Sequence, residues 1–209
     1  GDTPYFVVTL PLSEFLQAGL ESSVVHRVLH GELMMESTTD DCDPLKFLQW
    51  ERELRENEPA YERAAKLEVQ ARLLRFARVI SERPTAEYSA PALSRADQLA
   101  CFIARNYQEP LNSRSIAAAN GLHPNYAMNL FRQAFGTTIT TFITEHRISH
   151  AQRLLVTTED AILGVALAAG FQSLSRFNEV FKAACGCPPR DYRKAHRTNR
   201  DHHGFRGDP

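Results

Sequence analysis

The sequence lacks any apolar run near the roughly 20 residues that a membrane-spanning helix needs, and the stretch at 161–171 is far too short. No signal peptide opens the chain, which starts Gly1-Asp2 without an initiator methionine, so we expect a fragment of a longer protein. It also lacks any Ser/His/Asp or Cys/His constellation, glycine-rich phosphate loop or spaced set of metal ligands. We therefore expect no enzyme activity, no catalytic residue, no metal and no cofactor.

Cysteine is scarce, with four residues in 209. Cys101 falls on the apolar face of a predicted helix, which indicates a buried thiol. Cys185 and Cys187 form a C-x-C pair without the second cysteine pair that a structural zinc site requires. His202 and His203 are adjacent, but they lie in a polar tail that we expect not to fold. This pattern predicts a reduced, cytoplasmic protein without a disulfide framework.

The chain as a whole has no excess of positive charge, since its net charge is −1. Residues 1–90 carry 10 basic and 16 acidic residues, a net charge of −6. The remaining residues, 91–209, carry the other 14 basic and 9 acidic residues, a net charge of +5. The asymmetry indicates two modules, of which only the second can approach phosphates favourably.

Two stretches of the second half share one layout, residues 113–136 (the first motif) and 160–186 (the second motif). Each reads as an alanine-rich helix, a glycine stop, a short polar turn, and a second helix that ends in Phe-basic-x-x-x-Gly. This is the layout of a helix-turn-helix, whose second helix enters the DNA major groove. Two motifs in tandem are far more specific than one.

Helical periodicity divides the second helix of each motif into an inner and an outer face. In the first motif Ala127, Leu130, Phe131 and Ala134 face inward, and in the second Phe177, Val180 and Phe181 do. Asn and Gln side chains can read adenine, and Arg can read guanine or hold phosphate. We therefore predict DNA contacts from the outer residues: His123, Asn125, Tyr126, Met128, Asn129, Arg132 and Gln133 in the first motif, and Ser173, Leu174, Ser175, Arg176, Asn178, Glu179 and Lys182 in the second.

Within the second motif, Arg176 is the foremost candidate for a base contact, because it lies in the first turns of the helix. Glu179 has two possible roles, accepting a hydrogen bond from cytosine or orienting Arg176. Between the motifs, residues 138–156 read as one continuous helix of about 28 Å, close to the roughly 34 Å between successive major-groove entries. Arg147 and Arg153 on this helix are in a position to contact phosphate, but we expect them to be solvent-exposed.

The front half reads as a strand at 5–10, two short helices, a second strand at 33–37, and two longer helices at 44–82. An amphipathic face with Leu67, Ala71 and Leu74 allows either packing within the domain or a dimer interface. Residues 83–93 contain two prolines without periodicity and are predicted to be an interdomain linker. Ser94 is expected to cap the next helix, and residues 198–209 to be a disordered tail.

Six motifs carry a family resemblance: Ile116-Ala-x-x-x-Gly121, Phe131-Arg-x-x-x-Gly136, His146-Arg-Ile-x-x-Ala151-x-x-Leu-Leu155, Val165-Ala-x-x-x-Gly-Phe171, Arg176-Phe-x-x-x-Phe-Lys182 and Gly186-x-x-Pro-x-x-Tyr-Arg193. The stretch at 94–197 resembles the DNA-binding domain of the AraC/XylS family of bacterial transcription regulators. The resemblance implies a mainly α fold, with two three-helix units joined by a long linker helix. It also implies that residues 1–43 are the closing part of a cupin-type sensor domain, with 44–82 as a helical dimerisation element.

The resemblance further implies the partners. These are double-stranded DNA, a second copy of the chain, RNA polymerase, and a small-molecule effector such as a sugar, held by a part of the sensor that precedes this sequence. The function expected is a sequence-specific regulator, an activator of a carbohydrate or other catabolic operon. Two alternatives stay open: a DNA-repair methyl-acceptor enzyme carrying the same DNA-binding module, and an effector-sensing module with vestigial DNA units.

Overall fold

The structure is a computed structural model that describes residues 7–36, 42–56, 59–81 and 93–202, and within these ranges every regular element is a helix. The chain divides into two compact units, a front unit, Gly1–Gln98, and a rear unit, Leu99–Pro209. The division falls inside helix α5 (Arg95–Asn106), just after Ser94, where we predicted the second module to begin. None of the described helices combines the length and hydropathy of a membrane span.

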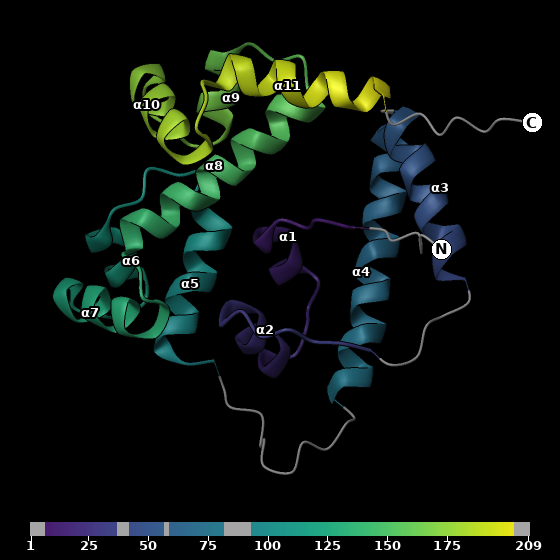
Figure 1. Ribbon diagram of the computed structural model, residues 1–209. Helices are drawn as coiled ribbons and strands as arrows, with labels where there is room; N and C mark the ends of the chain where they lie inside the picture. Colours follow the sequence, from purple (N-terminus) through teal and green to yellow (C-terminus); the bar gives the residue numbers. More distant parts are fainter. Residues whose placement is uncertain (1–6, 37–41, 57–58, 82–92, 203–209) are drawn as a thin grey trace, which may run out of the picture. The chain divides into compact units, whose positions relative to one another are not determined.

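The front unit contains α1 (Leu12–Gln17), α2 (Ser22–Leu29), α3 (Asp43–Glu56) and α4 (Pro59–Ser81). Helices α3 and α4 lie side by side (Figure 1). The indole N–H of Trp50 on α3 donates a hydrogen bond to the Glu68 carboxylate on α4. Arg72 on α4 donates to both carboxylate oxygens of Asp43 and, at 2.8 Å, to Glu36. These polar bonds tie α4 to α3 and to the segment before α3.

The two strands predicted for the front unit are not found in its described part. Residues 7–10 and 33–36 have no regular structure, and residues 5, 6 and 37 lie outside the described ranges. A β-rich run forms a strand only when another strand completes its backbone hydrogen bonds, and the described residues supply none. The two short helices were predicted correctly as α1 and α2.

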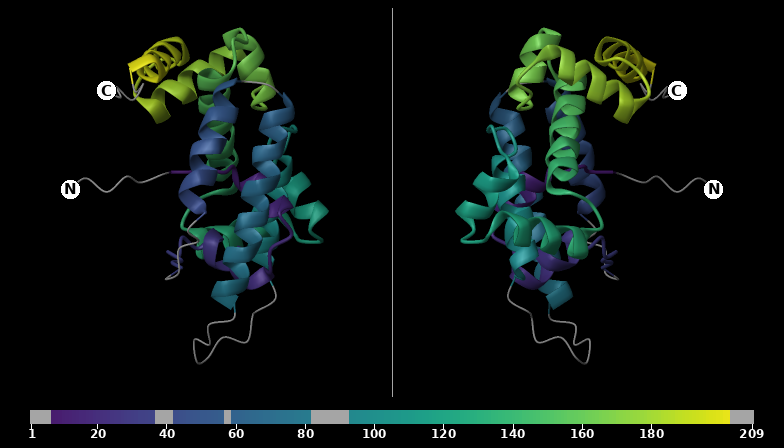
Figure 2. Two further views of the ribbon diagram at one scale, coloured as in Figure 1. Left: turned by 90° about the vertical axis from the view of Figure 1, so that its right-hand side faces the viewer. Right: turned by 90° about the vertical axis from the view of Figure 1, so that its left-hand side faces the viewer.

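The rear unit is built on a 19-residue helix, α8 (Ile139–Thr157), which confirms the continuous helix predicted at 138–156. Helices α6 (Ser113–Ala119) and α7 (Pro124–Phe135) lie at its first end, and α9 (Ile162–Ala168), α10 (Leu174–Cys185) and α11 (Pro189–His202) at its second. Figures 1 and 2 show α8 running between the two groups. The first motif is thus α6–α7 and the second is α9–α10.

Each end of α8 packs into a core with one motif. At the second end, a buried cluster joins α8 to α9 and α10 through Leu155, Val165, Phe177 and Phe181. At the first end the fully buried side chains include Leu99, Ile103, Ile116 and Phe131. Phe142 of α8 packs edge-to-face on Phe131, with ring centroids 5.2 Å apart. Aromatic and branched side chains at helical spacing therefore fix both motifs on one rigid helix.

Side-chain caps set where several helices begin. The Thr138 hydroxyl accepts a hydrogen bond from the Thr141 N–H at 3.1 Å and starts α8. Asn112 and Ser115 form a reciprocal capping box at α6. Ser94 caps α5 as predicted, since its hydroxyl accepts from the Asp97 N–H at 3.1 Å. Such caps satisfy backbone N–H groups that have no partner inside the helix.

Two expectations for the rear unit were wrong. Arg147 and Arg153 are half-buried rather than solvent-exposed. The Nε of Arg147 donates to the Tyr107 carbonyl at 2.7 Å and its Nη2 to the Glu109 carbonyl at 2.8 Å. The carbonyls that follow a helix lack intrahelical partners, and a guanidinium offers several donors to them. In addition, α11 continues to His202, into the segment predicted to be a disordered tail. No glycine or proline follows Pro189 before Gly204, so no residue breaks the helix earlier.

Candidate nucleic-acid interface

Helix α7 presents a polar outer face on an apolar support. Ala127 and Phe131 are fully buried and hold the helix on its core. All seven side chains predicted to contact DNA in the first motif are exposed: His123, Asn125, Tyr126, Met128, Asn129, Arg132 and Gln133. The face therefore offers amide groups and one guanidinium, which suit hydrogen bonding to base edges and phosphates.

Helix α10 repeats this division between a buried and an exposed face. Phe177 and Phe181 are fully buried, and Ser173 caps the helix by accepting a hydrogen bond from the Arg176 N–H at 3.3 Å. All seven residues predicted for the second motif are exposed: Ser173, Leu174, Ser175, Arg176, Asn178, Glu179 and Lys182. The outer face of α10 thus carries charges of both signs and one exposed leucine.

Two of the charged side chains of α10 form an ion pair. Arg176 Nη1 donates to Glu179 Oε2 at 3.0 Å, with the two side chains 65% and 70% exposed. An ion pair so open to water contributes little to stability, but it restricts the directions in which the guanidinium can point. Of the two roles considered for Glu179, this geometry favours orienting Arg176.

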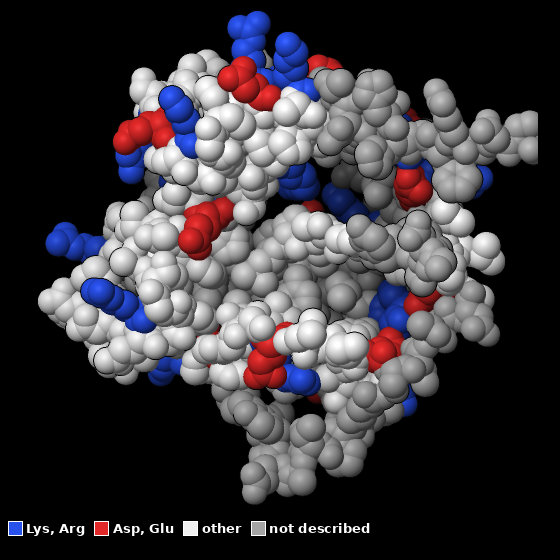
Figure 3. Space-filling view, in the orientation of Figure 1, with Lys and Arg blue, Asp and Glu red and all other residues white. Residues whose placement is uncertain are grey.

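The face of the molecule drawn in Figure 3 carries charges of both signs. Basic side chains there lie near acidic ones and do not merge into one continuous basic patch. Proteins that bind nucleic acid mainly through charge carry dense Lys and Arg patches. The sparse charge here favours contacts chosen residue by residue.

The middle of α8 contains two histidines whose pKa is lowered. Burial lowers the pKa of His146, which packs edge-to-face on Phe142. Burial, and secondarily the positive charge of Arg153, lowers the pKa of His150 to about 4. The Tyr107 hydroxyl and the Gln108 amide both lie 3.1 Å from His150 Nδ1. A neutral His150 therefore joins α8 to the end of α5.

Burial affects two of the cysteines. Cys101 is buried, as predicted. Burial raises the pKa of Cys185, although a hydrogen bond from Gln152 acts in the opposite direction. A raised pKa disfavours the thiolate that a methyl-acceptor or other nucleophilic cysteine requires.

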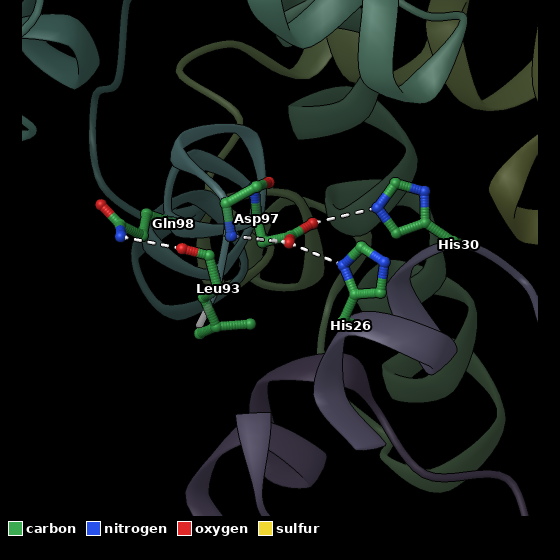
Figure 4. Close-up of polar contacts among 6 residues, drawn as sticks. His26, His30, Leu93, Asp97 and Gln98 are labelled. Atoms are coloured by element: carbon green, nitrogen blue, oxygen red, sulfur yellow. Dashed lines mark hydrogen bonds and ion pairs between the residues drawn. The ribbon is translucent and has the colours of Figure 1, made fainter. Parts of the chain in front are cut away.

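Sequence reasoning did not find one cluster of the front unit. His26 and His30 lie beside Asp97 there (Figure 4), although they precede it in the sequence by 71 and 67 residues. The pair at positions 26 and 30 has the i,i+4 spacing that places two histidines on one helical face. That spacing could have singled out the histidines, but no pattern in the sequence connects them with Asp97.

Two helix-turn-helix motifs on one connecting helix define the class of the rear unit as a DNA-binding module. A protein-family model described as a helix-turn-helix domain matches residues 116–195. The melibiose operon regulatory protein of Escherichia coli (strain K12) is 31% identical over 203 residues, which cover 93% of this chain and 67% of that protein. The chain belongs to the AraC/XylS family of transcription regulators.

Two further proteins show how far the similarity extends. The transcriptional activator NphR of a Rhodococcus species is 37% identical over 81 residues, or 39% of this chain and 24% of that protein. The crystal structure of the AdpA DNA-binding domain in complex with a target DNA matches with a TM-score of 0.50 and 24% identity, covering 52% of this chain and 97% of that one. The second match supports the fold of the rear unit.

Proposed function

We propose that this transcription regulator reads one asymmetric DNA site, with α7 in one major groove and α10 in the next. The observation that carries the proposal is the pair of exposed polar faces held at the two ends of α8. The length of α8, about 28 Å at 1.5 Å per residue, is close to the roughly 34 Å that separates successive groove entries. Because the connecting helix is rigid, α7 and α10 are already oriented relative to each other before the protein binds, so less conformational entropy is lost on binding.

The experiment that tests the proposal is selection from random duplex DNA with the 209-residue chain. The expected product is a motif of two different blocks about 10 bp apart. A single enriched block would make one of the motifs a scaffold only. Absence of enrichment at low salt, where phosphate contacts are strongest, would overturn the proposal.

Within this function, we assign a base contact to Arg176, held in direction by Glu179. Arg176→Ala should weaken binding to the selected site by about 1–3 kcal/mol and relax one base position. Arg75→Ala removes the same charge from an exposed position of α4 and is the matched control for general charge. If Arg176→Ala lowers the affinity for specific DNA and for random DNA by the same factor, Arg176 contacts phosphate rather than a base.

We further propose that the protein is a homodimer that joins through α3 and α4. Exposed leucines support this: Leu45 is 71% and Leu48 is 52% exposed on α3, and Leu67 is 58% and Leu74 is 45% exposed on α4. Several large exposed apolar side chains on two helices that pack together are typical of interaction sites. Sedimentation velocity should show dimers for the parent and monomers for Leu67→Glu/Leu74→Glu, whereas Arg75→Glu, a charge change at an exposed position on another face of the same helix, should leave the dimer intact.

Activation of transcription requires a contact with RNA polymerase, and we propose α9 for it. Leu163 and Leu167, one turn apart on α9, are 50% and 57% exposed. Leu163→Ser/Leu167→Ser should lower transcription from the selected site while DNA affinity stays unchanged.

The similarity to the melibiose operon regulatory protein supports a carbohydrate operon as the target and a sugar as the effector. Residues 1–43 would then close a cupin-type sensor domain.

A further inference from the structure

A compact group of nitrogen and oxygen donors lies in the front unit. His26 on α2, His30 at the end of α2 and Asp97 in the first turn of α5 bring one ligand atom each within 4.8 Å of one another. His26 Nδ1 lies 2.8 Å from Asp97 Oδ2, and His30 Nε2 lies 3.1 Å from Asp97 Oδ1. Figure 4 shows both imidazoles directed at the same carboxylate.

The separations are close to those of a zinc site. In tetrahedral zinc with ligands at 2.0–2.1 Å, neighbouring donor atoms lie about 3.3 Å apart. The three atoms here therefore need only small side-chain rotations to surround one ion. Two imidazoles four residues apart on one helical face are also the arrangement that helical zinc sites use.

The surroundings favour an ionised and fixed carboxylate. The Asp97 side chain is fully buried, whereas each histidine side chain is 29% exposed. The Ser94 backbone N–H donates to Asp97 Oδ2 at 3.0 Å. Burial raises the pKa of Asp97, but hydrogen bonds from His26, Ser94 and His30 outweigh it and hold the pKa below its usual range. Outer hydrogen bonds of this kind orient a metal ligand, and the two partly exposed imidazoles leave solvent a path to the site.

We propose that His26, His30 and Asp97 bind one Zn²⁺ ion, with water as the fourth ligand. Two imidazole nitrogens and a carboxylate oxygen are a donor set that zinc accepts and that Mg²⁺ does not prefer. Binding replaces the two hydrogen bonds to Asp97, so each imidazole adopts the tautomer with a free lone pair or releases a proton to solvent. The ion would join α2 to the first turn of α5, the helix that continues into the rear unit.

The first experiment is calorimetric titration of the 209-residue chain with Zn²⁺. The chain carries His202→Ala and His203→Ala, so that the adjacent histidines near its end cannot bind the ion. We expect one ion per chain, and a loss of at least about tenfold in affinity in His26→Gln and in His30→Gln. Glutamine can still donate a hydrogen bond to Asp97, so these variants keep the fold while removing a zinc ligand. Glu32→Gln removes a neighbouring carboxylate that pairs with Arg27 at 2.7 Å and should leave the affinity unchanged.

Two readouts decide the location of the ion. Zn²⁺ should raise the urea midpoint of Trp50 fluorescence, which reports the front unit, in the parent but not in His26→Gln. Co²⁺ should give a tetrahedral absorption spectrum without thiolate-to-cobalt charge transfer. Equal affinities in the parent and in both glutamine variants, a loss in Glu32→Gln as large as in those variants, or a charge-transfer band from the cysteines would each overturn the proposal. None of these measurements depends on DNA binding.

Discussion

The two helix-turn-helix motifs repeat the same frame at a spacing of 50 residues. Helix α10 begins and ends 50 residues after α7, from 124 to 174 and from 135 to 185, and α11 begins 50 residues after α8, from 139 to 189. Phe131 and Phe181 occupy equivalent positions, and both are fully buried. The core therefore imposes one geometry on both motifs.

The exposed faces do not repeat. At the same spacing Asn125 corresponds to Ser175, Met128 to Asn178 and Asn129 to Glu179, and all six are exposed. Packing constrains the inner residues, whereas nothing in the fold constrains the outer ones. The comparison teaches that the buried residues position each recognition helix, and that its outer residues determine which bases it contacts. Two different half-sites therefore follow from one repeated structure.

The turns of the two motifs also differ in their surroundings. Gly121 and Gly170 both have positive φ, +66° and +92°. A Cβ on Gly121 would meet nothing within 4 Å, whereas one on Gly170 would lie 2.8 Å from the Cα and the carbonyl oxygen of Gln108. The second turn is thus pressed against the backbone that follows α5, and the first is open.

The largest effect is expected from Gly170→Ala. Its positive φ costs about 1–3 kcal/mol, and the clash with the backbone adds about 1–3 kcal/mol of overpacking. Gly121→Ala has only the conformational cost, about 1–2 kcal/mol. Urea unfolding followed by circular dichroism measures both variants. Equal destabilisation would show that the contact at Gly170 relaxes freely and that the two turns are equivalent.

The second prediction concerns acid sensitivity in the middle of α8, at His150. Burial lowers the pKa of His150 from 6.5 to about 4, so below pH 6.5 the unfolded chain binds a proton that the folded chain does not. Stability is therefore full above pH 6.5 and falls as the pH decreases, with a loss of about 3 kcal/mol by pH 4.

Unfolding free energies of the parent and of His150→Gln between pH 7 and pH 4 test this prediction. Carboxylates titrate in both proteins, so the difference between the two curves isolates His150. The difference should shrink by about 3 kcal/mol as the pH falls. Parallel curves would show that His150 is protonated equally in the folded and unfolded chains.

Much of the rear unit could be predicted from the sequence, because its helices are long enough to show their apolar period and its turns carry glycine. The buried Phe131 and Phe181 and the exposed outer residues followed from that period. Arg147 did not, because its role as a carbonyl donor depends on the end of α5, which lies 38 to 40 residues away. Contacts that the fold creates between distant side chains leave no periodic signal.

The front unit was less predictable for the same reason. Residues 7–10 and 33–36 have the composition of strands but no regular structure, since strand formation depends on a partner rather than on the run itself. The cluster of His26, His30 and Asp97 depends on where α2 lies against the first turn of α5. The sequence spacing indicates only that His26 and His30 share a helical face, and it does not indicate that Asp97 lies beside them.

The third prediction sharpens the contrast between frame and face. Placing the second motif's residues on α7, as Asn125→Ser, Met128→Asn and Asn129→Glu together, should change stability by no more than about 0.5 kcal/mol per site, because all three are exposed. Affinity for the first half-site should fall by about 1–3 kcal/mol per lost base contact. Fluorescence anisotropy with DNA altered in one half-site at a time measures this. A loss that is the same for both half-sites would contradict separate reading.

The smallest effect is expected at the helix starts. Ser173 caps α10 through the Arg176 N–H, whereas His123, at the equivalent position of α7, makes no side-chain cap. Ser173→Ala should therefore cost about 1 kcal/mol, and His123→Ala no more than about 0.5 kcal/mol. Ser173→Asp separates the cap from any DNA contact, since aspartate caps as well as serine but repels phosphate. It should keep the stability of the parent and bind DNA more weakly. If Ser173→Asp lost as much stability as Ser173→Ala, the loss would not come from the cap, and α10 would not depend on it.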